Sequence, residues 1–90
     1  TGSVAFGTNN TASGANSTIT GGRYNTTSNI GAFIGGGGTN IASEWHSSVV
    51  GGYFDTAGGT GSCGGGGSTN TASGLNSFVG GGSTNVAAGQ

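Results

Sequence analysis

The sequence predicts an all-β fold, a parallel β-roll or β-helix solenoid of six coils with fifteen residues in each coil. Asn or Asp recurs once in every fifteen residues, and glycine recurs with the same period at another position. The chain has 24 glycines, no proline and no apolar pattern of helical period, which excludes helices. Identical residues at a fixed interval favour parallel coils stacked about 4.8 Å apart, so the six coils should span roughly 29 Å.

The 90 residues are expected to form one repeat domain, 1–90, made of six repeats. The repeats are 1–15, 16–30, 31–45, 46–60, 61–75 and 76–90. We number them coils 1 to 6 and number the positions within each repeat columns 1 to 15. Solenoids usually cover their last coils with atypical polar repeats, and neither end of this sequence has that character. We therefore expect a segment of a longer protein, or a unit that neighbouring chains continue.

Column 7 is glycine in every coil, which indicates a corner where the backbone needs positive φ or approaches a neighbour closely. These structural turn residues are Gly7, Gly22, Gly37, Gly52, Gly67 and Gly82. A second corner is expected in columns 13 to 15, where Ser-Gly or a related pair recurs. Each coil should therefore contain two turns and two short strands.

The first strand is expected in columns 2 to 5, and its column 4 should supply the apolar core. The predicted core residues are Val4, Ile19, Ile34, Val49 and Val79. Gly64 takes the same place in coil 5. The second strand is expected in columns 9 to 12, because column 11 is β-branched in every coil and β-branched residues suit a pleated surface.

Column 3 lies on the opposite face of the first strand from column 4, so its side chains should point outward. Phe33 and Phe78 occupy this column, as does Cys63. Large apolar side chains on an outer face need another surface to cover them. We predict that Phe33 and Phe78 pack against a second chain.

Column 10 is the most regular polar feature of the sequence. It consists of Asn10, Asn25, Asn40, Asp55, Asn70 and Asn85. One interpretation is an internal ladder in which stacked amides bond each other along the axis, and the other is an exposed stripe that binds a ligand. A buried carboxylate would lack the donors of an amide, so Asp55 should lie near the surface or near water.

No catalytic, cofactor or metal site is predicted. His46, Glu44, Asp55 and Cys63 could supply metal ligands, but they fall in different columns without a repeated spacing. His46 and Asp55 lie on opposite legs of their coil, which gives a Ser-His-Asp triad no supporting geometry. Residues 59–64 match GxGxxG, but that site needs a following helix. We therefore predict a protein that is not an enzyme and that binds no cofactor.

The composition also limits the partners. Arg23, Glu44 and Asp55 are the charged residues and the net charge is −1, so no basic surface for nucleic acid is expected. No apolar run is long enough to predict membrane insertion in this segment. A lone cysteine, Cys63, excludes a disulfide within the chain. Three N-glycosylation acceptor sequences, which arise easily by chance in an Asn-, Ser- and Thr-rich chain, begin at Asn9, Asn16 and Asn25.

Several runs in the sequence carry a family resemblance. SVAFG at 3–7, NTASG at 10–14 and 70–74, and NSFVGGG at 76–82 resemble the head repeats of trimeric autotransporter adhesins, the YadA-like head. Runs with the GGG corner are also similar to repeats in phage tail fibres. The resemblance implies a left-handed parallel β-roll, a homotrimer of chains packed side by side, and an extracellular position on a cell surface or a virion fibre. The family repeat is typically nearer fourteen residues, whereas here it is expected to be a uniform fifteen.

These observations predict a structural and adhesive β-roll segment of a trimeric surface adhesin or phage fibre. It would hold side chains out for a host surface protein or a glycan, because aromatic and Arg side chains dominate contact energies. The candidate ligand contacts are Arg23, Tyr24, Trp45, His46, Tyr53 and Phe54. Packing between chains is the alternative role of these residues.

Two other functions stay open from the sequence. A self-assembling extracellular filament could form if uncapped coils stack end to end. An ice-binding solenoid would need ranks of Thr, but columns 9 and 11 contain Thr-x-Thr only once, at Thr69 and Thr71.

Overall fold

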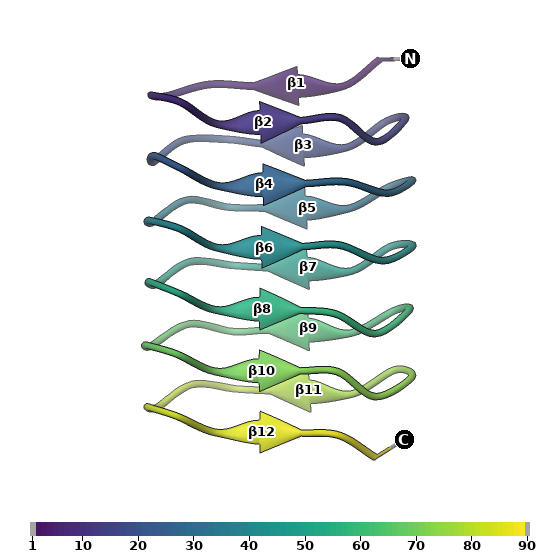
Figure 1. Cartoon of the computed structure of the whole chain (residues 1–90), viewed down its shortest axis with the longest axis vertical. Helices are drawn as coiled ribbons and strands as arrows, with labels where there is room; N and C mark the ends of the chain where they lie inside the picture. Colours follow the sequence, from purple (N-terminus) through teal and green to yellow (C-terminus); the bar gives the residue numbers. More distant parts are fainter. Residues whose placement is uncertain (1, 90) are drawn as a thin grey trace.

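The computed structural model describes residues 2–89, which form a parallel β-solenoid of six coils with two short strands in each coil (Figure 1). The odd-numbered strands are β1 (Val4–Ala5), β3 (Thr18–Ile19), β5 (Phe33–Ile34), β7 (Ser48–Val49), β9 (Cys63–Gly64) and β11 (Phe78–Val79). The even-numbered strands are β2 (Thr11–Ala12), β4 (Thr26–Thr27), β6 (Ile41–Ala42), β8 (Thr56–Ala57), β10 (Thr71–Ala72) and β12 (Val86–Ala87). Each set makes one parallel six-stranded sheet, which confirms the predicted all-β solenoid. The longest dimension is 31 Å, close to the predicted stack height.

Successive coils pair with an offset of fifteen residues, so that like columns stack on one another. Ile19 pairs with Ile34 in the odd sheet, and the even sheet keeps the same offset throughout. Coil 1 is the exception, because Val4 pairs with Thr18 and Ala5 pairs with Ile19, an offset of fourteen. Coil 1 therefore has one residue fewer between its strands than the other coils. The prediction of a uniform fifteen-residue repeat is wrong for this coil.

The shorter first coil moves Val4 out of the core. Val4 takes the outward place that column 3 has in the other coils, and its side chain is 40% exposed. The prediction of Val4 as a core residue is therefore wrong. Ala5 takes the place of column 4 instead, in register with Ile19.

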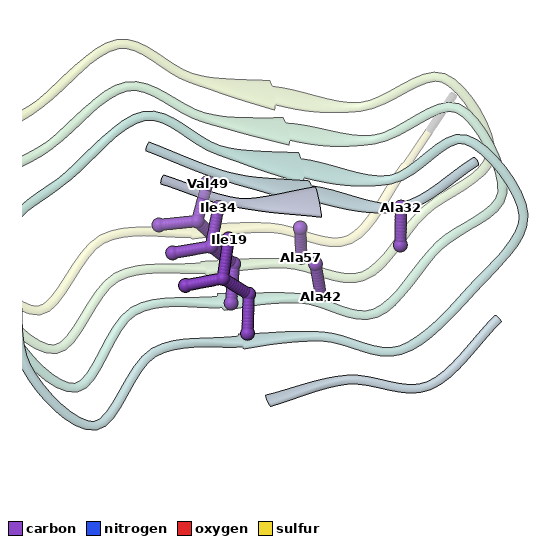
Figure 2. Packing of buried hydrophobic residues seen from close by; sticks show 6 residues of the cluster. All are labelled: Ile19, Ala32, Ile34, Ala42, Val49 and Ala57. Carbon is purple, nitrogen blue, oxygen red and sulfur yellow. The ribbon is translucent and has the colours of Figure 1, made fainter. Parts of the chain in front are cut away.

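The interior of the roll is a narrow apolar column. Ile19, Ile34 and Val49 are completely buried and lie one above the other (Figure 2), and Val79 is also buried. They face small side chains of the even strands, such as Ala42 and Ala57. Since the coil is short, an aliphatic side chain from one sheet meets only a methyl group from the other. The core prediction is thus confirmed for the four aliphatic residues of coils 2, 3, 4 and 6.

The chain turns twice in each coil, and the two turns lie at opposite ends of the coil (Figure 1). We call columns 6 to 9, between an odd strand and the next even strand, the glycine corner. All six column 7 glycines there have φ between 84° and 96°. In Gly37, for example, an added Cβ would also clash with the carbonyl oxygen of Gly52 in the next coil. Both predicted reasons for glycine at this corner, positive φ and close approach, therefore apply.

The other turn, in columns 13 to 1, is held by buried serines of column 2, and we call it the serine corner. The Ser17 hydroxyl donates to the carbonyl of Gly14 at 2.7 Å. In coil 4, the Ser47 hydroxyl donates to the carbonyl of Glu44 at 2.7 Å and accepts from its N–H at 3.1 Å. These side-chain bonds satisfy backbone groups that the strands leave unpaired at the turn.

Column 9 adopts a conformation that the sequence did not predict. All six of its residues have φ between 55° and 58°, in the left-handed region: Asn9, Tyr24, Thr39, Phe54, Thr69 and Thr84. The left-handed turn reverses the direction of the N–H group, so that Tyr24 and Phe54 donate to the preceding coil, to Thr8 and Gly38. Strand N–H groups donate to the following coil instead. Column 9 therefore belongs to the glycine corner, and the even strands are shorter than predicted.

Candidate functional site

Column 10 forms a continuous hydrogen-bonded ladder inside the roll. In coils 1 to 5, the column 10 Oδ1 accepts from the backbone N–H of the column 10 residue in the next coil, at 2.8 to 2.9 Å. The Asn40 Nδ2 donates to the carbonyls of Gly36, in its own coil, and Gly52, in the next coil, both at 2.9 Å. Of the two interpretations, the internal ladder is the one observed. Its bonds join amides to backbone groups, however, and not amides to each other as predicted.

Asp55 lies within this ladder and is only 1% exposed, so the prediction that it lies near the surface or near water is wrong. Its Oδ1 accepts from the N–H of Asn70 at 2.8 Å, as an Asn side chain would. Its Oδ2 has no hydrogen-bond partner within residues 2–89. The carbonyls of Gly51 and Gly67, at the positions that receive Nδ2 bonds from the other ladder residues, therefore receive no donor from Asp55.

The outward side of the odd sheet, which we call the odd-strand face, carries large apolar side chains among the hydroxyls of Thr18, Thr20 and Ser48. Val4, Phe6, Phe33, Val50, Cys63 and Phe78 lie on it, together with smaller side chains. Phe78 is 64% exposed and Phe33 is half-buried, so both point outward from the strand face opposite Val79 and Ile34. The structure therefore places the two Phe residues where the sequence predicted them.

The outward side of the even sheet, the even-strand face, has a different character. Column 11 on this face is Thr11, Thr26, Ile41, Thr56, Thr71 and Val86, and column 13 is Ser13, Ser28, Ser43, Gly58, Ser73 and Ala88. Both columns lie on the same side, since a Cβ added at Gly58 would contact the Thr56 methyl group and the Ser43 hydroxyl. The face contains hydroxyl and small apolar groups and neither charge nor aromatic ring.

Four of the predicted ligand contacts gather at the glycine corner. Arg23 and Tyr24 come from coil 2, and Tyr53 and Phe54 come from coil 4. The Tyr53 ring lies over Gly38 of the intervening coil, and a Cβ there would be 2.8 Å from two ring carbons. Tyr24 and Phe54 both have a left-handed backbone, and both of their side chains are exposed. The corner thus presents three aromatic side chains, Tyr24 from coil 2 and Tyr53 and Phe54 from coil 4.

The other two predicted contacts, Trp45 and His46, lie at the serine corner. The His46 ring covers Gly31 of the preceding coil. Trp45, the residue before His46, has an exposed side chain. Because the two corners are at opposite ends of the coil (Figure 1), the structure divides the six predicted contacts into two separate groups. A single ligand site that includes all six is not formed.

The residues with metal-binding atoms are not brought together. Within residues 2–89, no group of three or more His, Cys, Asp or Glu side chains could hold a metal ion. No pocket forms in the described part of the chain either.

Three structural features escaped the sequence analysis: the left-handed backbone of column 9, the left-handed backbone of column 1, as at Asn16, His46 and Asn76, and the shorter coil 1. The left-handed column 9 has no sequence signal, because Tyr, Phe and Thr are poor residues for that conformation. The shorter coil 1 had a signal that was not used. Gly2 has φ of 78° and occupies the place of Gly31 and Gly61, so aligning these glycines would have revealed the missing residue.

The comparisons with known proteins do not assign this solenoid to a family. No protein-family model and no curated protein matches the chain. Among residues 2–89 there is no helix long and apolar enough to cross a membrane.

Proposed function

We propose that this chain is a structural and adhesive β-roll segment of a trimeric surface adhesin or phage fibre, located outside the cell and without enzymatic activity. The observation that carries the proposal is the uncovered odd-strand face. Phe78, Phe6 and Val50 are each more than half exposed on it. Large apolar side chains gathered on one exposed face usually mark a place where another molecule binds.

The geometry of the face favours further copies of the same chain as the partner. The in-register stack makes the face straight along the 31 Å axis, so a second roll can lie beside it over its full length. Three left-handed rolls packed side by side would cover these side chains and leave the even-strand faces outside. The sequence resembles YadA-like heads, and the odd-sheet pairing of coil 1 has their typical fourteen-residue spacing, whereas the other strand pairs keep fifteen.

The test is the solution mass of the chain, measured by light scattering over a concentration series. We expect a constant mass of about 25 kDa, three times 8.3 kDa. A variant with Phe33→Ser and Phe78→Ser should be smaller, because it loses both Phe rings of the odd-strand face. The matched control, Tyr24→Ser with Phe54→Ser, removes two aromatic rings from the glycine corner and should keep the wild-type mass. A wild-type mass in the Phe double variant would refute this interface.

Cys63 offers a second readout on the same face. It is half-buried and pairs in register with Ser48 and Phe78 on the neighbouring strands. In the assembled protein, a thiol reagent should label Cys63 slowly, and the Phe double variant should be labelled faster. Equal labelling rates would place the interface elsewhere.

The adhesive part of the proposal rests on the exposed aromatic side chains of the two corners, which a trimer built on the odd-strand faces leaves accessible. The ligand would be a host surface protein or a glycan. Binding of the assembled protein to immobilised host proteins and glycans should fall in the Tyr24→Ser, Phe54→Ser variant if the glycine corner is used, and in Trp45→Ser if the serine corner is used. Unchanged binding in both variants would refute adhesion through the corners.

A self-assembling extracellular filament is the second candidate. Strand N–H groups all donate toward the following coil, as when Thr26 donates to Asn40, so each coil complements the next along a polar axis. The same bonds could join one chain to another end to end, as in strand addition at a sheet edge. A mass that grows with concentration would favour the filament over the closed trimer.

A further inference from the structure

The Thr hydroxyls of the even-strand face have unused hydrogen-bonding capacity. Within residues 2–89, the hydroxyls of Thr26, Thr56 and Thr71 have no protein partner, whereas Thr20 on the other sheet donates to the carbonyl of Gly35. Ser13 is the column 13 residue whose hydroxyl donates to a carbonyl, that of Thr27. The free hydroxyls must therefore bond to solvent.

These hydroxyls stand in two ranks with gaps, because column 11 has no hydroxyl at Ile41 and Val86 and column 13 has none at Gly58 and Ala88. Parallel coils place like residues of one column about 4.8 Å apart along the axis, and columns two residues apart in a strand are about 6.6 Å apart. The even strands stack in a straight row (Figure 1), in register from β2 to β12. The column 10 ladder beneath them holds each coil in place. Rigidity of the backbone thus fixes the positions of the side-chain oxygens.

Apolar groups lie between the hydroxyls. The methyl groups of Thr, with the side chains of Ile41 and Val86, give the same face an apolar component, and no charged side chain interrupts it. Such a surface orders the water above it. The hydroxyls hold water at fixed points, and the methyl groups limit other hydrogen-bonding arrangements.

We propose that the even-strand face binds ice. The fixed spacing of the hydroxyls along the solenoid axis would hold water in a repeating pattern, and water held in this way can join the surface of an ice crystal. The relevant ranks are columns 11 and 13. The sequence pattern suggested columns 9 and 11 as the ranks. Column 9 is left-handed and lies in the glycine corner, so it is not part of the even-strand face.

This activity does not depend on the proposed adhesive function, because it uses the opposite sheet from the odd-strand face. In a trimer built on the odd-strand faces, the even-strand faces stay exposed on the outside. The two proposals can therefore fail separately, and the experiment reports on both.

The experiment measures thermal hysteresis and the shape of growing ice crystals with the assembled wild-type protein and two Lys variants. Thr56→Lys places a long charged side chain in the middle of the array and should reduce hysteresis to the level of buffer. The matched control is Thr60→Lys, in the same coil but at the exposed serine corner, and it should keep wild-type hysteresis. Thr71→Val, which retains the methyl group and loses the hydroxyl, should cause a partial loss.

Three results would overturn the ice-binding proposal. The first is the absence of hysteresis in the wild-type protein, and the second is an equal loss in both Lys variants. The third is a change of solution mass in Thr56→Lys, which would mean that the even-strand face packs against a second copy and is not free. An unchanged mass with loss of hysteresis in Thr56→Lys supports the proposal whether or not the Phe variants disassemble.

Discussion

The Oδ1 of Asn40 accepts a hydrogen bond from the backbone N–H of Asp55 at 2.9 Å, and these residues hold the same position in successive coils. A strand of two residues gives little information about its register, since one face carries only one side chain. The column 10 bond supplies that information from inside the roll, because a shift of one residue would bury a different side chain and break the bond. The ladder therefore aligns the coils that carry both outer faces.

Asp55→Asn should stabilise the protein. The new Nδ2 would donate to the carbonyls of Gly51 and Gly67, as the Nδ2 of Asn70 does to Gly66 and Gly82 at 2.8 and 2.9 Å. Repairing an unpaired buried polar group is worth about 1 to 3 kcal/mol. Thermal and denaturant unfolding at neutral pH should show this increase. The reverse substitution, Asn40→Asp, should lower stability, and a less stable Asp55→Asn would contradict the account of the ladder.

Gly37→Ala should destabilise the roll by about 2 kcal/mol or more, because φ is 91° and the added Cβ clashes with the carbonyl of Gly52. Gly36→Ala is the control. A Cβ at Gly36 meets no atom within 4 Å, and its stability should stay within about 1 kcal/mol of the wild type. Similar midpoints of urea unfolding for the two variants would argue against a left-handed column 7.

Gly64→Ala should stabilise the core by about 1 to 2 kcal/mol. Gly64 is buried in the aliphatic column, and the nearest atom to an added Cβ is Cγ2 of Val49, at 4.0 Å. The methyl group therefore fills space and also restricts the unfolded chain. Gly65→Ala, one residue further, would clash with the carbonyl of Gly80 and should lower the melting temperature. The two variants should thus shift the melting temperature in opposite directions.

Thr39→Asn should stabilise the glycine corner by about 1 kcal/mol, because Asn tolerates the left-handed conformation better than a β-branched residue. Thr39 has φ of 55° and is exposed, so little packing is lost. The control is Thr26→Asn, in strand β4, where Asn is a poorer strand residue than Thr and should not stabilise. Equal effects at the two positions would indicate that Thr39 is not left-handed in solution.

The candidate surfaces could be predicted only in part. Phe33 and Phe78 were placed outward correctly, since alternation along a strand separates column 3 from column 4 whatever the rest of the chain does. The sequence could not show whether Arg23 and Trp45 lie at the same corner. Which corner a side chain occupies depends on where each strand begins and ends, and the left-handed column 9 makes the even strands begin later than predicted.

The residues alone were enough to predict the parallel solenoid, its glycine corners and the burial of Ile19, Ile34, Val49 and Val79, because a fixed period makes like residues stack and alternation chooses their face. The tertiary structure decided the shorter first coil, the left-handed corner residues and the burial of Asp55. Each of these depends on the neighbouring coil. Val4 turns outward because Ala5 pairs with Ile19. Asp55 is buried because its N–H donates to Asn40 and its Oδ1 accepts from the N–H of Asn70, which holds its coil in register. A local rule about one side chain cannot include such constraints, since they come from backbone groups a whole coil away.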